Sequence, residues 1–171
     1  MTPTKREGVG PAGPAEATTG KAAIQGFEQA VTNEEEAKNW RSVSDRKIRV
    51  GIAGYGVCGF GAAFHFQDHP NVTVAAVADL DPDKCAELAK RCRCETMYPS
   101  CEELIGDDSL EAIFIATDAP SHARLAIASL NAGKHVASAV PAVFGSLEDA
   151  DLLFDAVKAS DRKYMMFETS Y

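Results

Sequence analysis

Six short apolar runs are spaced along the chain from about residue 46 onward. They share strand length and a preference for β-branched and small apolar side chains, and they cover residues 48–53, 72–78, 96–98, 112–116, 135–138 and 164–167. Unbroken apolar runs of this length are typical of strands that are buried on both faces, as in a parallel sheet. The pattern therefore predicts six strands, most of them buried and parallel.

Helix signals fill the stretches between these runs. Asp81 precedes a proline, and Ser100 and Ser146 each stand three residues before an acidic residue, which is typical of a helix N-terminus. The predicted helices cover residues 60–67, 84–92, 100–105, 122–132 and a longer stretch after residue 146. In the last helix an apolar repeat is expected to face the sheet, namely Ala150, Leu153, Phe154 and Val157. Strands that alternate with helices through short connections predict an α/β fold, a Rossmann-type doubly wound parallel sheet of six strands.

A glycine-rich turn follows the first predicted strand without a break. Its sequence is Gly54-Tyr55-Gly56-Val57-Cys58-Gly59, which has the G-x-G-x-x-G spacing of a dinucleotide-binding turn. Gly54 permits the tight turn, Gly56 lets the backbone approach a pyrophosphate, and Gly59 lets the next helix pack closely on the strand. We expect that helix to direct its N-terminal amides toward the phosphates. The motif alone also fits a Gly-rich turn in an α/β domain that binds no nucleotide.

An acidic residue ends the second predicted strand. Asp79 stands about twenty residues after Gly59, where a carboxylate accepts a hydrogen bond from a ribose 2′-hydroxyl and repels a 2′-phosphate. The turn and Asp79 together predict a site for NAD rather than NADP. A flavin or S-adenosylmethionine site would use the same two features.

The first part of the chain has a different composition. Residues 1–20 are rich in Pro, Gly, Thr and Ala, so they have too few large apolar side chains to offset the entropy cost of ordering. Ile24, Phe27 and Val31 have helical spacing, and Trp40 is a candidate anchor on the folded part. We predict that residues 1–45 form a largely disordered extension with short helices at most, and that residues 46–171 form one NAD-binding domain.

Composition excludes several classes of partner. The 171 residues are 46% hydrophobic and carry a formal net charge of −8, so a core is available but the basic surface that nucleic acids and anionic membranes require is not. No apolar stretch has the length of a membrane span, and the N-terminus lacks the apolar core of a secretory signal. The five cysteines fit reduced thiols and lack the paired spacing of a zinc site. We therefore expect no nucleic-acid or membrane partner, no metal and a cytoplasmic location.

Two further motifs carry a resemblance to a known family. Residues 116–123 read Ala-Thr-Asp-Ala-Pro-Ser-His-Ala, and residues 131–136 read Asn-Ala-Gly-Lys-His-Val. With the glycine turn and Asp79, over about residues 46–171, they resemble the Gfo/Idh/MocA oxidoreductases. The first is similar to the family's T-P-x-x-x-H-A loop and the second to its A-G-K-H-V strand entry. The resemblance implies a nicotinamide cofactor and a substrate among sugars, inositols and related polyols.

The resemblance also implies site residues. In the family the loop after the fourth strand lines the cofactor cleft near the nicotinamide ribose, which implies cofactor-binding roles for Thr117, Pro120 and His122. From its place at a strand entry His135 is expected to be structural, and Lys134, just before that strand, is expected to point toward the end of the sheet opposite the nucleotide. The expected cofactor-binding set is Gly54, Tyr55, Gly56, Val57, Cys58, Gly59, Asp79, Thr117, Pro120 and His122.

Two departures separate this chain from the usual family pattern. Where the family carries Glu-Lys-Pro, with a lysine tied to substrate binding and proton transfer, the chain reads Ala139-Val140-Pro141. A valine has no titratable group, so it cannot move a proton and the catalytic residue stays unassigned. Family members also continue into a second α/β domain that holds the substrate, so we expect this chain to be a fragment without its substrate domain.

These features predict the NAD-binding domain of an oxidoreductase that transfers a hydride between nicotinamide and a sugar-like or polyol substrate. One alternative is an NAD-dependent glycosidase of the same family, because those enzymes are similar at Val140-Pro141-Ala142 and at residues 165–168. The other is a nucleotide-binding module without catalysis, which the valine and the missing second domain favour. The expected partner is a small sugar-like molecule, a homo-oligomer is compatible with the family, and the chain alone is expected to be inactive.

Overall fold

The computed structural model describes residues 40–167. The segment predicted to be disordered at its start, the helical spacing of Ile24, Phe27 and Val31, and the last four residues lie outside the described residues. Where the description begins, the Trp40 ring lies 4.9 Å from the ring of His69, as expected of an anchor.

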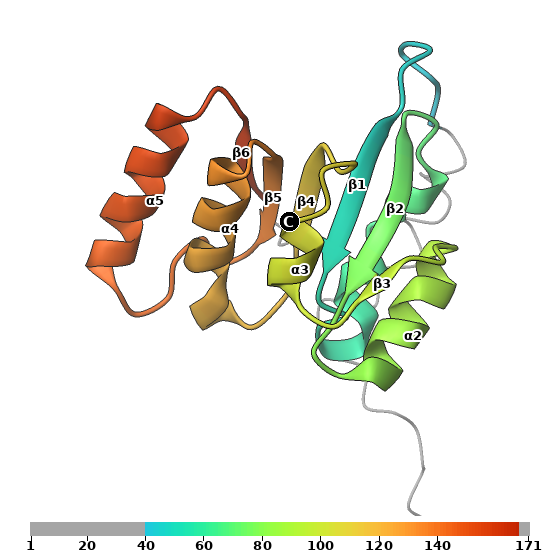
Figure 1. The fold of residues 1–171 in the computed structure, drawn as a ribbon, viewed down its shortest axis with the longest axis horizontal. Coiled ribbons are helices and arrows are strands. Elements are labelled where there is room, and N and C mark those ends of the chain that lie inside the picture. Colours follow the sequence, from blue (N-terminus) through green and yellow to red (C-terminus); the bar gives the residue numbers. More distant parts are fainter. Residues whose placement is uncertain (1–39, 168–171) are drawn as a thin grey trace, which may run out of the picture.

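Six parallel strands form one sheet in the order β3-β2-β1-β4-β5-β6 (Figure 1). The strands are β1 Ile48–Ala53, β2 Val72–Ala78, β3 Met97–Tyr98, β4 Ala112–Ile115, β5 His135–Ala139 and β6 Tyr164–Phe167. The chain builds outward from β1 to β3, then returns to the other side of β1 with β4. This order confirms the predicted Rossmann-type doubly wound sheet and places the topological switch point between β1 and β4.

Helices with side-chain caps connect most of these strands. Within the described residues the α-helices are α2 Pro82–Cys92, α3 Cys101–Ile105, α4 His122–Asn131 and α5 Leu147–Ala159. The side chains of Asp81, Ser100 and Ser146 accept hydrogen bonds of 3.0 to 3.3 Å from backbone amides two or three residues later. These bonds satisfy amides that have no partner inside the helix, which confirms the predicted starts of α2, α3 and α5.

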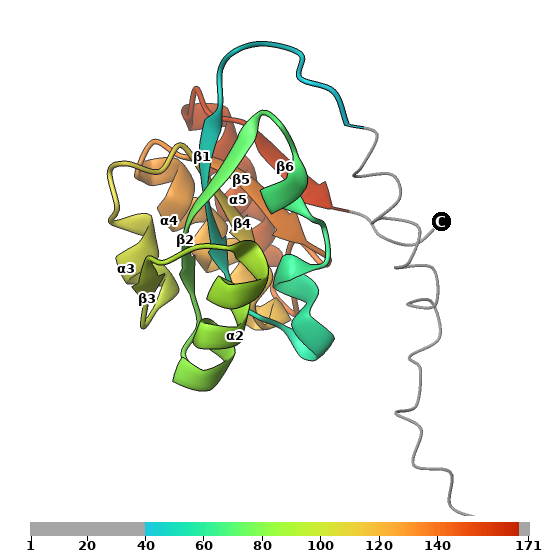
Figure 2. The ribbon, with the colours of Figure 1, turned by 90° about the vertical axis from the view of Figure 1, so that its right-hand side faces the viewer.

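The helices cover the two faces of the sheet in separate groups. On one face α3, α4 and α5 lie side by side over a core that includes Leu104, Leu125 and Ile113 (Figure 1). On the other face α2 packs Leu88 over Ile52. Figure 2 shows α2 and the connection between β1 and β2 on the side of the sheet away from α4. Burial on both faces explains why the strands of the sheet centre are continuous apolar runs.

The connection between β1 and β2 differs from the prediction. Instead of an α-helix at residues 60–67, it forms two short 3-10 helices, η1 Val57–Ala62 and η2 Phe66–Asp68. Gly59 has a φ of 80° and His65 a φ of 53°, and neither conformation occurs inside an α-helix. Gly61, inside the predicted helix, also disfavours it by about 1 kcal/mol relative to alanine. The prediction was wrong because it left out the cost of Gly61 and the positive φ of His65.

A cluster of phenylalanines holds this connection on the sheet. Phe64 and Phe66 lie against Phe114 of β4 and Phe167 of β6, with ring centroids 5.1 to 5.7 Å apart and the rings edge to face. Edge-to-face pairs at this spacing are favourable beyond their buried area. The aromatic cluster therefore packs the connection against the sheet although it contains no α-helix.

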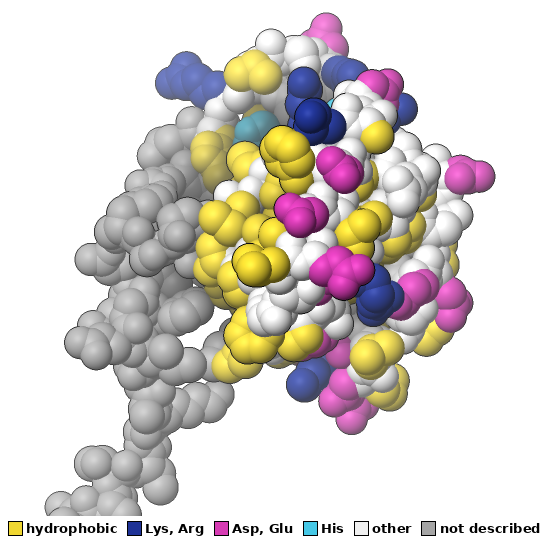
Figure 3. All heavy atoms as spheres, turned by 90° about the vertical axis from the view of Figure 1, so that its left-hand side faces the viewer, with side chains coloured by type: hydrophobic (Ala, Val, Ile, Leu, Met, Phe, Trp, Pro, Cys, Tyr) yellow, Lys and Arg dark blue, Asp and Glu magenta, His cyan; other side chains and the backbone are white. Residues whose placement is uncertain are grey.

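The inner side of α5 is narrower than predicted. Leu153 is buried as expected, but Phe154 is 62% exposed, and the Nζ atom of Lys158 lies 5.1 Å from the centre of its ring. Adjacent helical residues point about 100° apart, and α5 is rotated so that Leu153 faces the sheet and Phe154 faces outward. The prediction for Phe154 was wrong. Figure 3, which looks onto the side of the molecule formed by α5, shows hydrophobic side chains among acidic and basic ones on this surface.

Candidate functional site

The glycine turn lies at the carboxyl end of β1, in contact with the loop that follows β4. Gly54 and Gly56 have positive φ values of 93° and 68°, a conformation that side chains other than glycine rarely adopt. A Cβ atom on Gly54 would lie 2.5 Å from the carbonyl oxygen of Ala116 and 2.9 Å from the amide nitrogen of Thr117. The turn therefore packs backbone against backbone on the second loop, and a side chain at Gly54 would force the two apart.

Gly61 brings the connection after the turn close to β1. A Cβ atom on Gly61 would overlap the carbonyl oxygen of Gly54 and lie 3.4 Å from Cγ2 of Ile52. This is the close approach that the sequence motif assigned to Gly59, whereas a Cβ atom on Gly59 would meet the guanidinium group of Arg91. Sequence reasoning missed Gly61 because the motif ends at Gly59; a further glycine two residues later was the available signal.

Arg91 of α2 covers the outer side of the turn. Its guanidinium carbon lies 5.2 Å from the centre of the Tyr55 ring, a distance at which a cation is attracted to the ring face. Its Nε atom donates a 3.0 Å hydrogen bond to Glu87, which holds the pKa of that carboxyl below its usual value. No motif pointed to Arg91, because its place depends on how α2 packs against η1. The structure thus adds a positive charge beside the glycine turn.

Asp79 joins the glycine turn to the start of α2. Its Oδ2 atom accepts a hydrogen bond of 2.7 Å from the amide of Tyr55, and its Oδ1 atom accepts one of 2.9 Å from the amide of Asp81. These two bonds fix the carboxylate at the carboxyl end of β2. An ionised carboxylate has about four acceptor positions, so it keeps capacity for a further donor such as a hydroxyl.

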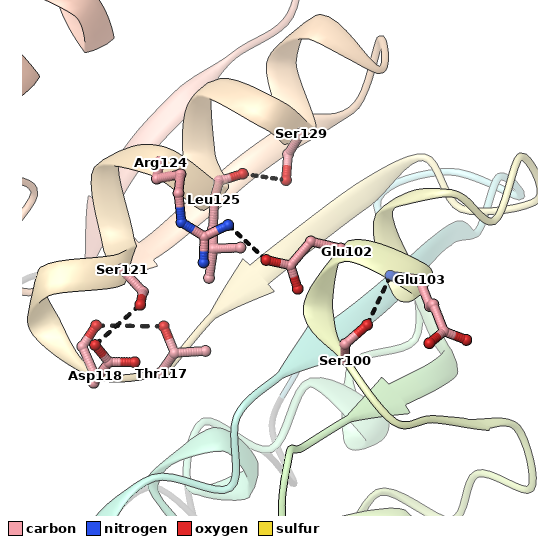
Figure 4. A network of polar contacts seen from close by, with 9 residues as sticks. All are labelled: Ser100, Glu102, Glu103, Thr117, Asp118, Ser121, Arg124, Leu125 and Ser129. Carbon is pink, nitrogen blue, oxygen red and sulfur yellow. Dashed lines mark hydrogen bonds and ion pairs between the residues drawn. The ribbon is translucent and has the colours of Figure 1, made fainter.

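Thr117 and Pro120 lie in the loop between β4 and α4, which includes the 3-10 helix η3 Ala119–Ser121. Thr117 is half-buried and Pro120 is exposed. The hydroxyl of Ser121 donates a 3.0 Å hydrogen bond to Oδ2 of Asp118, and Figure 4 shows Thr117, Asp118 and Ser121 together at this corner. The loop therefore has internal side-chain support at the same edge of the sheet as the glycine turn.

Helix α4, which continues from this loop, is fastened to α3. Arg124 forms an ion pair with Glu102 of α3, and the hydrogen bond lowers the pKa of that carboxyl (Figure 4). Farther along α4, the buried hydroxyl of Ser129 donates to the carbonyl oxygen of Leu125 at 2.8 Å. Helix α4 therefore holds in place the end of the loop that leads into it.

His122, the first residue of α4, is only 2% exposed. Its Nε2 atom lies 3.1 Å from the carbonyl oxygen of Thr117, and its Nδ1 atom lies 2.8 Å from the carbonyl oxygen of Pro141. The imidazole therefore stands between the loop after β4 and the loop after β5.

The segment that departs from the Glu-Lys-Pro pattern follows β5. Ala139 is buried and Val140 is 37% exposed, and neither side chain has a polar atom. Lys134 directly precedes β5, at the amino ends of the strands and away from the glycine turn. Its buried Nζ atom donates to the carbonyl oxygens of Asp107 and Leu110 at 2.7 and 3.0 Å. The direction expected for Lys134 is confirmed, and its ammonium group has a structural role.

The thiols and acidic groups of this part of the chain show no metal-binding arrangement. Among residues 40–167, no three His, Cys, Asp or Glu side chains are grouped so as to hold a metal ion. Burial raises the pKa of the Cys92 and Cys101 thiols to about 12, so both stay protonated at neutral pH. The helices in the described range are all too short or too polar to cross a membrane.

The sequence of this chain matches the model of a known protein family. Residues 48–168 match the model of a family described as "Oxidoreductase family, NAD-binding Rossmann fold". The match includes the glycine turn, Asp79, the Thr117–His122 loop and the segment after β5.

Relatives and solved structures agree with this match. A glycosyl hydrolase family 109 protein of Phocaeicola vulgatus is 33% identical over 117 residues, which cover 62% of this chain and 22% of the relative. An inositol 2-dehydrogenase of Acidothermus cellulolyticus is 32% identical over 101 residues, which cover 54% of this chain and 28% of the relative. The fold is similar to that of scyllo-inositol dehydrogenase from Lactobacillus casei, solved with NAD(H) and scyllo-inositol, with a TM-score of 0.65, 21% identity and coverage of 71% of this chain and 36% of the other. The chain thus spans about a quarter of the length of these two curated relatives.

Proposed function

The chain belongs to the Gfo/Idh/MocA family of oxidoreductases, and from this premise we propose that it is the NAD-binding domain of an enzyme that transfers a hydride between nicotinamide and a sugar-like or polyol substrate. The family binds NAD(H), and the dehydrogenases among the relatives act on inositols by name. The activity of the whole protein and the substrate domain are part of the proposal.

The residues at the switch point suit a dinucleotide. A Cβ atom on Gly56 would lie 3.2 Å from the carbonyl oxygen of Ala116, so the glycine keeps a side chain out of the narrow gap between the turn and the second loop. Dinucleotides lie across the ends of the strands at such a point, so the adenosine ribose belongs at Asp79 and the pyrophosphate at the glycine turn. The nicotinamide half then extends toward Thr117 and Pro120. When bound, the nicotinamide ring accepts or releases the hydride.

Asp79 is the observation that carries the proposal. Two backbone amides, of Tyr55 and Asp81, hold its carboxylate in place before any ligand arrives. A carboxylate fixed in this way accepts from a 2′-hydroxyl without losing further side-chain entropy, and it repels a 2′-phosphate. The expected preference is therefore for NAD over NADP.

Calorimetry on the purified chain with NAD and NADP tests this proposal. We expect Asp79→Ala to weaken NAD binding about 10- to 100-fold, the usual worth of hydrogen bonds to a charged group. Asp83→Ala removes an exposed carboxylate four residues later, in the first turn of α2, and is expected to leave the affinity unchanged. Equal NAD affinity in wild type and Asp79→Ala, or a wild-type preference for NADP, would count against the ribose role.

A second candidate is an NAD-dependent glycoside hydrolase. The Phocaeicola vulgatus relative favours it, as does the absence of a titratable group at Val140, because such an enzyme is similar at Val-Pro-Ala. Release of nitrophenol from a nitrophenyl glycoside without added oxidant, measured on a protein that includes this chain and a substrate domain, would support this candidate. Turnover of a polyol with net NAD reduction, and no glycoside cleavage, supports the dehydrogenase.

A third candidate is a module that binds the nucleotide without catalysis. It is favoured by the two apolar side chains at Ala139 and Val140, which offer no proton donor or acceptor. NAD binding together with neither polyol oxidation nor glycoside cleavage in the whole protein would support it.

A further inference from the structure

The buried side chain of His122 contacts two loops. In the part of the chain that the structure describes, the partners of its two ring nitrogens are backbone carbonyl oxygens and not carboxylates. Its Nε2 atom faces the carbonyl oxygen of Thr117 and its Nδ1 atom faces that of Pro141, at 3.1 and 2.8 Å. The two carbonyl oxygens belong to loops that follow different strands, β4 and β5. A single imidazole therefore spans the gap between two adjacent strand ends.

Carbonyl oxygens accept hydrogen bonds and cannot donate them, so each contact requires a hydrogen on the ring nitrogen that makes it. The tautomer with a hydrogen on Nε2 holds Thr117, and the tautomer with a hydrogen on Nδ1 holds Pro141. Only a ring with both hydrogens holds both loops at once. The two ties are thus separable in principle, by side chains that supply one donor or the other.

The tie to Thr117 continues to the glycine turn. The amide nitrogen of Thr117 and the carbonyl oxygen of Ala116 are the atoms that a Cβ on Gly54 would meet. A chain of direct contacts therefore runs from Pro141 through His122 and Thr117 to Gly54. It crosses the ends of three neighbouring strands, β5, β4 and β1.

We propose that His122 is a positioning residue, which sets the spacing between the Thr117 loop and the segment after β5 and so shapes the nicotinamide end of the cleft. The inference rests on the proposed function, because the nicotinamide end exists only if the chain binds a dinucleotide. In this proposal His122 acts through the carbonyl groups of Thr117 and Pro141, because its ring is only 2% exposed, and this differs from the direct cofactor contact that the family resemblance implies. The adenosine end, at Asp79, lies on the other side of the glycine turn and does not depend on it.

Two amide variants separate the ties. In His122→Asn the amide nitrogen stands near the position of Nδ1 and retains the Pro141 tie, whereas in His122→Gln it stands near Nε2 and retains the Thr117 tie. We expect each variant to weaken NAD binding about tenfold, as loss of a buried hydrogen bond does, because each releases one of the two loops whose spacing His122 sets. ADP-ribose, which lacks the nicotinamide, is expected to bind both variants within about threefold of wild type.

His135→Gln is the matched control. The Nδ1 atom of His135 accepts a 3.0 Å hydrogen bond from the amide of Lys163 at the opposite edge of the sheet. This variant makes the same chemical change on a histidine remote from the cleft, and it is expected to leave the affinities for NAD and ADP-ribose unchanged.

Hydrogen exchange of the unliganded variants tests the ties without any cofactor. We expect faster exchange in residues 117–121 for His122→Asn and in residues 140–144 for His122→Gln, relative to wild type. The same exchange in both variants overturns the inference, whether or not ADP-ribose binds. Equal loss of NAD and ADP-ribose binding in His122→Asn also overturns it, because the defect then extends beyond the nicotinamide end. A wild-type chain that binds neither ligand overturns the proposed function, and the exchange pattern then still decides whether His122 ties the two loops.

Discussion

The glycine turn after β1 and the loop after β4 lie side by side at one edge of the sheet, but different forces hold them in shape. The turn depends on the backbone: Gly54 and Gly56 have positive φ values, and Gly61 brings η1 against β1. The loop after β4 depends on side chains, because Ser121 is bound to Asp118 and the ring nitrogens of His122 lie within hydrogen-bond distance of two carbonyl oxygens. The turn is therefore shaped mainly by its glycines, with one side-chain bond from Asp79 to the Tyr55 amide, whereas the loop after β4 is shaped mainly by its own side chains.

This difference follows from what each loop is expected to contact. A phosphate group is bound most closely by bare backbone amides, so side chains are excluded where it approaches. The nicotinamide half needs walls at a set distance, which side chains fixed by hydrogen bonds provide. The two loops meet where Gly54 packs on Ala116, so a change in either one is transmitted to the other at that contact.

Alanine at Gly54 is expected to give the largest effect of the substitutions that break this comparison. The left-handed conformation costs about 1–2 kcal/mol for a residue with a side chain, and overlap with the Ala116 carbonyl adds about 1–3 kcal/mol. Urea unfolding and NAD calorimetry measure the two consequences, lower stability and lost binding. Gly145→Ala is the matched control, because Gly145 also has a positive φ of 75° but has no atom within 4 Å of the added Cβ. Equal costs at both positions would mean that the contact between the two loops contributes nothing.

The apolar runs of the sequence predicted six strands in a doubly wound parallel sheet, because the strands at the sheet centre are buried over short, continuous runs. The caps of α2, α3 and α5 were predictable for a different reason, because each depends only on residues two or three apart in the sequence. The connection at residues 57–68 was not, because its form depends on the conformation of Gly59 and on contacts of Phe64 with distant strands. The exposure of Phe154 likewise depends on how α5 is rotated against the sheet.

The site was predictable to a similar extent. Asp79 and Gly54 follow directly from local motifs, and the structure places them at adjacent strand ends. Arg91 and Gly61 were not predicted, because each acts on the turn through packing between segments. The two contacts of His122 join residues far apart in the sequence, so no local pattern contains them. The cofactor contacts of the individual site residues stay predictions.

Arg91→Ala tests whether a second side chain, besides Asp79, supports the glycine turn. If it does, the two loops differ less in how they are held. Loss of its contact with the Tyr55 ring is expected to lower the free energy of unfolding by about 0.5–1 kcal/mol and to weaken NAD binding by a few-fold. Lys158→Ala removes the comparable contact with Phe154 on exposed α5 and serves as the control for affinity. Unchanged NAD affinity in both variants would mean that Arg91 adds nothing to NAD binding beyond what the glycines and the Asp79 carboxylate supply.

Glu111→Gln is expected to give the smallest effect. It tests whether the distance between the two loops is fixed by contacts within the loops or by the pairing of β1 with β4, the strands that lead into them. Glu111 joins the starts of β1 and β4: its Oε2 atom accepts from the amide of Arg49 at 3.1 Å, and its other oxygen pairs with Arg46. The amide of Arg49 and the guanidinium of Arg46 hold the pKa of Glu111 below its usual value of 4.5.

A carboxyl whose pKa is lower in the folded chain than in the unfolded chain adds stability above the unfolded pKa, and that stability is lost as the pH falls through the folded pKa. Urea unfolding should therefore show wild type more stable than Glu111→Gln by less than about 1 kcal/mol at pH 7, with the difference shrinking below about pH 4.5. NAD affinity at pH 7 should be the same in both, because the hydrogen bonds that shape the two loops lie at the opposite edge of the sheet. A change in affinity as large as that from Arg91→Ala would mean that the strand pair, and not the glycine backbone or His122, sets the distance between the loops.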